Sequence, residues 1–357
     1  MKIIDRYIFF EILKKSIYVL ISLVSIFSFF KFLEELDRIG EKQYTISTAM
    51  QYLFLSLPAF FNMFTVLGLL IGTIFSIGQM NSSKELQIMH TASVSRVSLI
   101  KKSIIFPFLV SIVLIIFFET ISPHASDLAF KIRSKALGNL IINQDENFWL
   151  KRDDKIIFFQ YEKNNEKSAH IFQLKNNLDL ISIVKSDRAS LKEKYIDLES
   201  SEKFELDSNG RFFNILKSSS DDNLRINFDS EQITSLNKKI STMSIKDLVN
   251  AIRFSYVNDL NYNNFLIELE TRIIKPISLA ALILLALPFV MNLQRNTSIA
   301  NRVFIALCIG IVFHLVSKAS TVLAMKFPEI ASFGAILPSL VLMTIGIILI
   351  RFKLRDV

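Results

Sequence analysis

Long apolar runs occupy both ends of the chain, whereas the middle is polar. Between four and six runs are apolar over about 18 residues or more, which at about 1.5 Å per residue is enough to cross a hydrocarbon core of about 30 Å. We assign six transmembrane helices, three on each side of the polar middle. They cover residues 13–33, 52–78, 103–121, 273–292, 303–325 and 332–350.

The polar middle changes to a period of two. Short alternating segments such as "DKIIFFQYEK" and "RFFNILK" are separated by clusters of Asn, Asp, Lys and Gly, which is typical of antiparallel strands. Such strands at near-regular spacing predict an all-β sandwich or roll. Helical periodicity then returns and predicts one or two amphipathic connecting helices. The predicted division of the chain is 1–122, 123–242, 243–272 and 273–357.

Composition and charge favour a membrane protein. The chain of 357 residues is 51% hydrophobic with a mean hydropathy of +0.40, which is too apolar for a soluble domain. Its net charge of +8 comes from Lys and Arg concentrated at alternate ends of the predicted helices, which argues against a nucleic-acid partner. The positive-inside rule places both termini and residues 80–102 in the cytoplasm and the polar middle outside.

No motif for catalysis or metal binding stands out. The single cysteine, Cys308, excludes an intrachain disulfide and a thiolate zinc site. Glu119, His124 and Asp127 come nearest to the carboxylate or histidine cluster that a lipid-modifying enzyme would need, but a polar helix end explains them. None of the nine glycines begins a G-x-x-x-x-G-K-[ST] loop. Any process driven by ATP would therefore need its nucleotide and Mg²⁺ on a partner chain, and we expect no cofactor here.

The stretch "NSSKELQIMHTASVS", residues 81–95, predicts a short cytosolic helix near 82–92. Ser82 and Glu85 have the spacing of a capping box. Three further residues, Leu86, Met89 and His90, are expected to share one face.

Two interpretations of this helix remain open. It could lie on lipid headgroups with its apolar side in the interface. Alternatively, it is a coupling helix that fits a groove of a soluble partner, with Glu85 binding a cation of that partner. The second is favoured because lipid-binding helices are rich in Lys and Arg.

Several long segments resemble one family. "IDRYIFFEIL" at the start, the run from Leu55 to Ser95, "ENFWLKRDDKIIFFQ" and "LALPFVMNLQRNTSIANRV" are similar to the lipopolysaccharide-export permeases, the LptF/LptG family, over essentially the whole chain. The resemblance implies six transmembrane helices with a periplasmic β-jellyroll between the third and fourth, in a multi-pass protein of the bacterial inner membrane. It resembles the G subunit more than the F subunit.

The same resemblance implies partners and a function. Such permeases form a heterodimer with an LptF-like sister permease, are driven by an LptB-like ATPase dimer, and pass lipopolysaccharide to LptC-like and LptA-like periplasmic bridge proteins. We therefore expect a non-catalytic transmembrane subunit of an ABC-type exporter. The alternative is a mechanotransmission subunit that moves its outer domain without conducting lipid.

Site residues follow partly from this resemblance. Glu85 matches the coupling-helix glutamate, and Lys31 matches a lysine that approaches lipid phosphates. Two other cations are lipid-binding candidates by position alone: Arg133, just outside the third span, and Lys318, within the fifth. The resemblance also matches Arg295 and Arg302 to basic positions of the cytosolic loop between spans four and five.

Overall fold

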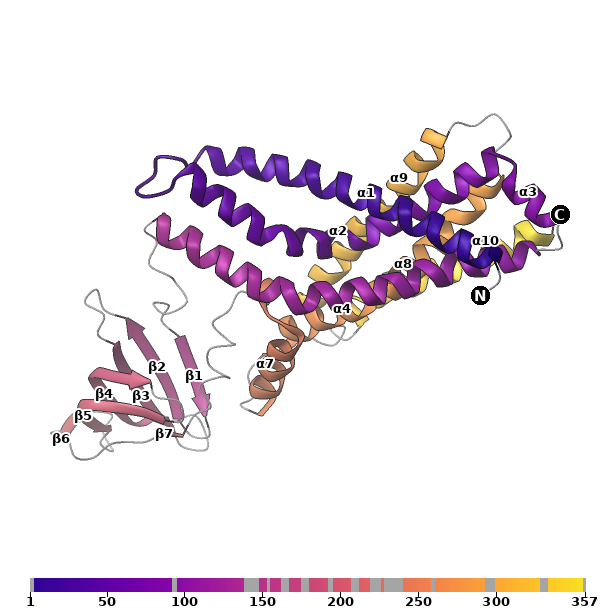
Figure 1. Cartoon of the computed structure of the whole chain (residues 1–357). Coiled ribbons are helices and arrows are strands. Elements are labelled where there is room, and N and C mark those ends of the chain that lie inside the picture. Colours follow the sequence, from indigo (N-terminus) through magenta and orange to yellow (C-terminus); the bar gives the residue numbers. More distant parts are fainter. Residues whose placement is uncertain are drawn as a thin grey trace. The chain divides into compact units, whose positions relative to one another are not determined.

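Five long helices dominate the computed structural model of the chain (Figure 1). Each is long and apolar enough to cross a membrane. They are α1 (Ile3–Leu36), α2 (Ile46–Ser82), α4 (Arg96–Ala136), α8 (Asn263–Asn292) and α9 (Ile299–Lys326). The sixth predicted span corresponds to α10 (Leu337–Arg355), whose apolar part, Leu337–Phe352, is shorter than the other five. Five spans are therefore supported by length and composition.

The structure describes most of the helices and only parts of the polar middle. The described residues are 3–91, 95–137, 148–152, 155–161, 167–174, 180–191, 195–206, 212–218, 226–227, 240–257, 261–292, 299–327 and 333–355. They form two units. The helical unit comprises Met1–Leu137 and Leu266–Val357, and the sheet unit comprises Gly138–Phe265.

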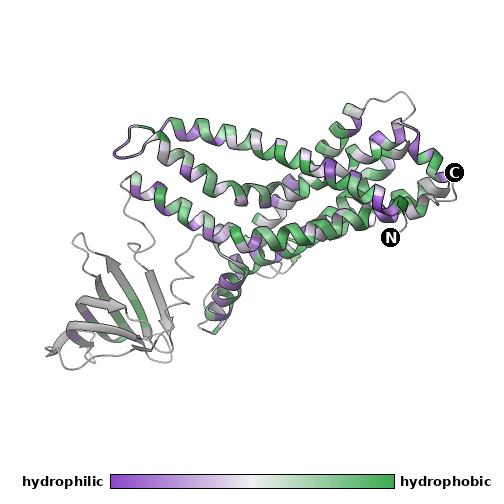
Figure 2. Cartoon of the chain, in the orientation of Figure 1, coloured by the Kyte–Doolittle hydropathy of each residue, from purple (hydrophilic) through white to green (hydrophobic). Residues whose placement is uncertain are grey.

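The core of the helical unit is built around α2 and α8. Leu70 and Ile74 of α2 pack with Leu282 and Ala286 of α8, and all four are almost completely buried. Hydrophobic residues also cover the outward faces of the long helices (Figure 2). A helix that is apolar on all sides suits a lipid environment, because its outer face needs no water.

Small residues allow α1 and α2 to approach closely. A Cβ atom built on Gly72 would lie 2.3 Å from the Cα atom of Ser16, and one on Gly68 would lie 2.9 Å from the Cδ1 atom of Leu20. Only glycine fits at such a crossing without displacing the neighbouring backbone. The two helices therefore form one closely packed pair.

Two helices extend past the boundaries predicted from the sequence. Pro123 was taken as the start of the outer domain, but α4 continues through Pro107 and Pro123 to Ala136. α8 starts at Asn263, ahead of the predicted span at 273, because the amphipathic part of the connector and the span form one helix. Proline removes one backbone donor and does not end a helix that tertiary packing supports.

The sheet unit is an antiparallel meander. Successive strands β1 to β6 pair in chain order, and β7 pairs with β5. The strands are β1 (Phe148–Arg152), β2 (Lys155–Tyr161), β3 (Lys167–Leu174), β4 (Leu180–Leu191), β5 (Tyr195–Leu206), β6 (Phe212–Ser218) and β7 (Ile226–Asn227). Ile157, Ile171 and Val184 form a buried row across β2, β3 and β4. The described strands thus form the inserted antiparallel β domain that the alternating segments predicted, and the jellyroll form stays a prediction.

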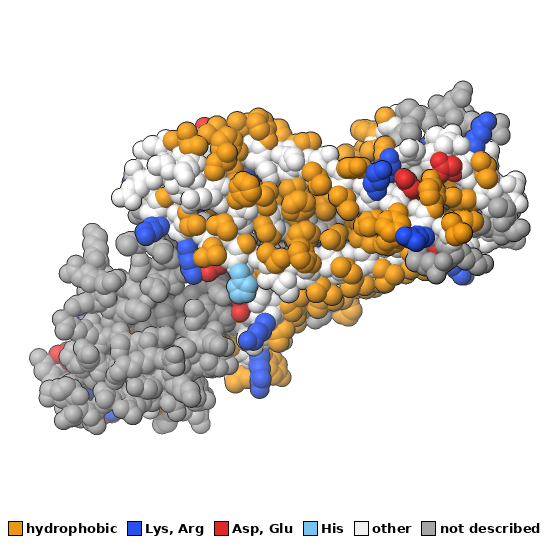
Figure 3. Space-filling model, viewed as in Figure 1, with side chains coloured by type: hydrophobic (Ala, Val, Ile, Leu, Met, Phe, Trp, Pro, Cys, Tyr) orange, Lys and Arg blue, Asp and Glu red, His pale blue; other side chains and the backbone are white. Residues whose placement is uncertain are grey.

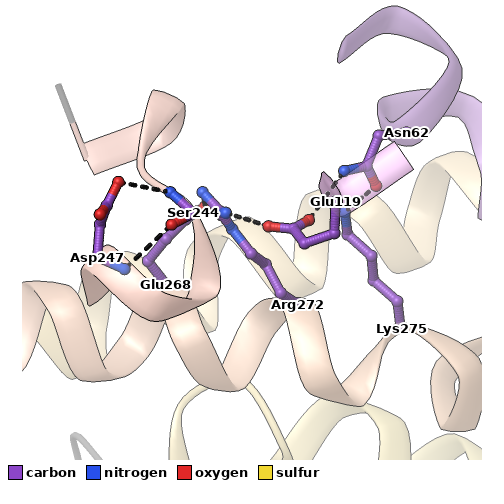
Figure 4. Close-up of polar contacts among 7 residues, drawn as sticks. All are labelled: Asn62, Glu119, Ser244, Asp247, Glu268, Arg272 and Lys275. Atoms are coloured by element: carbon purple, nitrogen blue, oxygen red, sulfur yellow. Dashed lines mark hydrogen bonds and ion pairs between the residues drawn. The ribbon is translucent and has the colours of Figure 1, made fainter. Parts of the chain in front are cut away.

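A capped helix follows the strands. The helix α7 (Ile245–Val257) begins after Ser244, whose Oγ atom accepts from the backbone N–H of Asp247, while Asp247 Oδ2 accepts from the N–H of Ser244 (Figure 4). This reciprocal pair is a capping box. Leu248, Ala251 and Phe254 are buried at helical spacing. α7 is therefore the amphipathic helix that the periodicity predicted within the connector.

Candidate functional site

A short helix, α3 (Glu85–Thr91), connects α2 to α4. We call the end of the helical unit that carries it the α3 end, and the opposite end, where residues 37–45 join α1 to α2, the turn end (Figure 1).

The predicted capping box is wrong, because Ser82 is the last residue of α2 and its Oγ atom donates to the carbonyl of Gly78 at 3.0 Å. Lys84, with a φ of 64°, makes the sharp turn into α3.

Both carboxylate oxygens of Glu85 are occupied within the chain. The Tyr7 hydroxyl, from the first turns of α1, donates to Oε2 at 2.8 Å, and the Ser83 hydroxyl donates to Oε1 at 2.7 Å. Two bonds from different elements fix the direction of the carboxylate at the start of α3. Glu85 is therefore positioned before any partner binds.

The two faces of α3 have different surroundings. Leu86 and Met89 face inward, against Ile8 and Leu99 of α1 and α4. On the other face, Ile88 has an exposed fraction of 65%. His90, predicted to share the face of Leu86 and Met89, is exposed and does not belong to this buried contact. The surface that α3 presents outward consists of Gln87, Ile88, His90 and Thr91.

Arg302 is buried and does not belong to a basic loop. It lies in the first turns of α9, is only 1% exposed, and donates from Nη1 to the carbonyl oxygen of Gly78 at 2.8 Å. The assignment of Arg302 to a cytosolic loop is therefore wrong, because α9 starts earlier than the predicted span. Arg295, the other predicted loop residue, lies outside the described residues.

A polar cluster connects three of the long helices (Figure 4). Glu119 of α4 accepts from Arg272 of α8 at Oε1 and from the amide of Asn62 of α2 at Oε2, the latter at 3.1 Å. Lys275 Nζ donates to Asn62 Oδ1 at 2.9 Å, and Arg272 Nε donates to Glu268 at 2.9 Å. We call these five residues the Glu119 cluster.

The Glu119 cluster is electrically balanced and mostly buried. Arg272 and Glu119 have side-chain exposures of only 8% and 7%. Two cations face two carboxylates, so the cluster offers no spare charge for an ion. Arginine can form such multiple bonds because its guanidinium has five donors in a fixed plane. The arrangement fixes α2, α4 and α8 relative to one another.

Sequence reasoning missed the α8 members of this cluster. Glu119 was weighed only together with His124 and Asp127 and explained as part of a polar helix end. Arg272 fell at the end of the predicted connector, and Lys275 fell in the predicted fourth span. Their spacing, with Glu268 one turn before Arg272, was the available signal, since charges one turn apart share a helix face. Their contact with Glu119 of α4 had no such signal, because contacts between distant segments produce no periodic pattern in the sequence.

A second cluster lies at the turn end. The carboxylate of Glu35 accepts from Arg133 Nε at 3.0 Å and from the Tyr44 hydroxyl at 2.7 Å. The Arg133 guanidinium also lies over the ring of Tyr52, 5.2 Å from its centroid. Burial of Tyr44, together with its hydrogen bond to Glu35, raises the pKa of the Tyr44 phenol above its usual value. Arg133, predicted as a lipid-binding candidate, is therefore paired within the chain and only 20% exposed.

The other two lipid-binding candidates lie on different helices, Lys31 partly exposed and Lys318 exposed. Lys31 of α1 pairs with Glu34 at 2.6 Å and retains 34% side-chain exposure. Lys318 is exposed on α9, among apolar residues such as Leu315 and Val322. Figure 3 shows hydrophobic side chains over the middle of the helical unit, with charged side chains toward its two ends.

These features define a class of protein. Long helices with apolar outer faces, charged groups near their ends and an inserted antiparallel sheet describe a multi-pass membrane protein. The chain belongs to the family of lipopolysaccharide export system permeases LptF/LptG, whose model matches residues 6–351.

Two relatives illustrate the similarity. The lipopolysaccharide export system permease protein LptG of Haemophilus influenzae is 23% identical over 351 residues, which covers 94% of this chain and 95% of the relative. The protein of the same name from Escherichia coli K12 is 21% identical over 346 residues, or 94% of each chain. The similarity therefore covers nearly the full length of both relatives.

Proposed function

We propose that this chain is the G-type transmembrane subunit of an ABC-type exporter that extracts lipopolysaccharide from the inner membrane. The exporter would pass the lipid to a periplasmic bridge of LptC-like and LptA-like proteins, together with an LptF-like sister permease. Membership of the permease family and the length of the match to LptG relatives support this assignment.

The observation that carries the proposal is the construction of α3. Its inner face is attached to α1 and α4 through Leu86 and Met89, while Ile88 is exposed on its outer face. Glu85 is held at its start by Tyr7 and Ser83. A force applied to α3 would therefore reach the long helices directly, as required if a separate ATPase drives their movement. The motor would be an LptB-like ATPase dimer that holds ATP and Mg²⁺.

Charge distribution supports the orientation. Lys and Arg concentrate in the short segments at the α3 end, so the positive-inside rule favours a cytoplasmic α3 end with both termini, and a periplasmic sheet unit. α3 would then face the ATPase, while the turn end and the sheet unit would face the periplasmic partners.

The helical surface suits a substrate with several acyl chains. Exposing a buried chain to water costs about 0.8 kcal/mol per CH₂ group, so an extracting protein must cover the chains with apolar surface. α1 and α9 offer such surface, including Phe29, Phe30 and Leu315. Lys31, near the turn end of α1, would meet a lipid phosphate, and its pair with the exposed Glu34 is weak enough to exchange.

Co-purification tests this proposal. The chain would be expressed with its cognate ATPase and sister permease and purified in detergent, and bound lipid would be identified by mass spectrometry. The expected result is an assembly of two ATPases and two different permeases that carries lipopolysaccharide. An assembly without lipid would support the mechanotransmission alternative, and a chain that purifies alone would refute both.

A further inference from the structure

Arg302 has an unusual environment for a permanently charged side chain. It is 1% exposed, its Nη1 atom donates to Gly78, and its Nε atom is buried without a hydrogen-bond partner among the described residues. We infer that Arg302 is a positioning residue that makes the first turns of α9 move together with the α2–α3 junction. This inference rests on the proposed function, since it concerns how motion of α3 reaches the lipid-facing helices.

The charge of Arg302 is stabilised mainly by the end of α2. A guanidinium does not lose its proton in a protein, so burial cannot neutralise it. The carbonyl of Gly78 lies in the last turns of α2, where the partial negative charge of a helix C-terminus accumulates. If α9 slid relative to α2, the buried cation would lose this partner. The α2 terminus and the start of α9 are therefore expected to move as one body.

The same carbonyl connects Arg302 to α3. Gly78 O also accepts from the Ser82 hydroxyl, and the next residue, Ser83, donates to the carboxylate of Glu85. A Cβ atom on Gly78 would lie 3.2 Å from Arg302 Cδ, so glycine allows the close approach. Short contacts thus link the acid of α3 to the first turns of α9.

The contact of α9 with α2 continues beyond Arg302 along one face. Ala306, one turn later, is completely buried, and a Cβ atom on Gly310, two turns later, would lie 2.6 Å from Leu67 Cδ1. From Ile311 onward α9 is largely exposed, including the turn that carries Lys318. The attached half of α9 would therefore transmit displacement to the half that faces lipid.

Stability alone does not explain an arginine here. A buried charged group can often be replaced by an apolar side chain of similar volume with neutral or favourable effect on stability. Arg302→Met is therefore expected to leave folding and assembly intact. The coupling between ATP hydrolysis and lipid release would be lost. Arg302→Lys keeps the charge and should restore coupling in part. Arg351→Met, at an exposed position of α10, is the matched control.

The experiment uses the full complex with its ATPase and sister permease in proteoliposomes, and measures ATP hydrolysed and lipopolysaccharide released. For Arg302→Met we expect unchanged thermal stability and a fall of about fivefold or more in lipid released per ATP. Arg351→Met should match the wild type. If the wild type itself releases no lipid on ATP addition, the proposed function fails. If the wild type releases lipid on ATP addition and Arg302→Met releases as much lipid per ATP as the wild type does, the inference is wrong.

A second measurement does not depend on the folding of that variant. Gln79 and Phe304 are both exposed beside the contact, so cysteines there can carry spin labels in a Cys308→Ala background with Arg302 intact. Because the two positions belong to one body in this inference, their distance should be the same before and after ATP binding. A change in distance on ATP binding would overturn the inference.

Discussion

Arg272 of α8 pairs with Glu119 of α4 across a separation of 153 residues. The contact joins the helices before the inserted sheet unit to those after it. Asn62 of α2 completes the connection by donating to the same carboxylate. The two halves of the transmembrane region are thus fixed by charged groups as well as by the apolar core.

The first prediction concerns this pair. Glu119→Gln leaves Arg272 with the partly exposed Glu268 as its remaining counter-charge. Removal of one partner of a buried ion pair costs about 3–5 kcal/mol. We expect a marked fall in the thermal unfolding temperature of the detergent-purified protein. Glu34→Gln, at a carboxylate with 52% exposure, is the control and should change it little.

A double substitution tests whether the loss of stability comes from the charge of Arg272 that Glu119 no longer balances. Glu119→Leu combined with Arg272→Met removes both charges together, so its unfolding temperature should lie close to that of the wild type. A double variant that is as unstable as Glu119→Gln would show that other contacts of these residues carry the effect.

The long apolar helices and the strands were predictable from periodicity, whereas the polar sites were only partly so. Glu85 was found because it follows a recognisable helix start, although Ser82 turned out to end the preceding helix. Arg302 was misplaced because α9 begins at Ile299, four residues before the predicted span at 303. Arg133 was predicted only from its position beside the third span, since sequence patterns do not reveal that it shares Glu35 with Tyr44.

The second prediction concerns the crossing of α1 and α2. Gly72→Ala would place a methyl group 2.3 Å from the Ser16 backbone, which cannot rotate away. Such overpacking costs about 1–3 kcal/mol. Gly68→Ala should cost less, because the nearest atom is the end of the Leu20 side chain. Thermal unfolding of both variants tests the order, and an equal or reversed order would contradict the described crossing.

The third prediction separates the two faces of α3. Ile88→Asp changes an exposed side chain, so it should abolish co-purification of the ATPase and leave the unfolding temperature unchanged. Leu86→Asp puts a charge against the core formed with Ile8 and Leu99, so it should destabilise the permease itself. Retention of the ATPase by the Ile88 variant would show that the partner does not bind this face.

The fourth prediction distinguishes the two cations near the turn end. Lys31→Gln breaks only an exposed pair, worth about 0–1 kcal/mol, so stability should be unchanged while photocrosslinking to lipopolysaccharide falls. Arg133→Gln leaves the nearly buried Glu35 with Tyr44 as its remaining donor, so this variant should be less stable whether or not lipid is present. Its crosslinking is therefore compared at a temperature where both variants remain folded. If Lys31→Gln lowers stability and leaves crosslinking unchanged, its contribution is structural and the proposed phosphate contact is wrong.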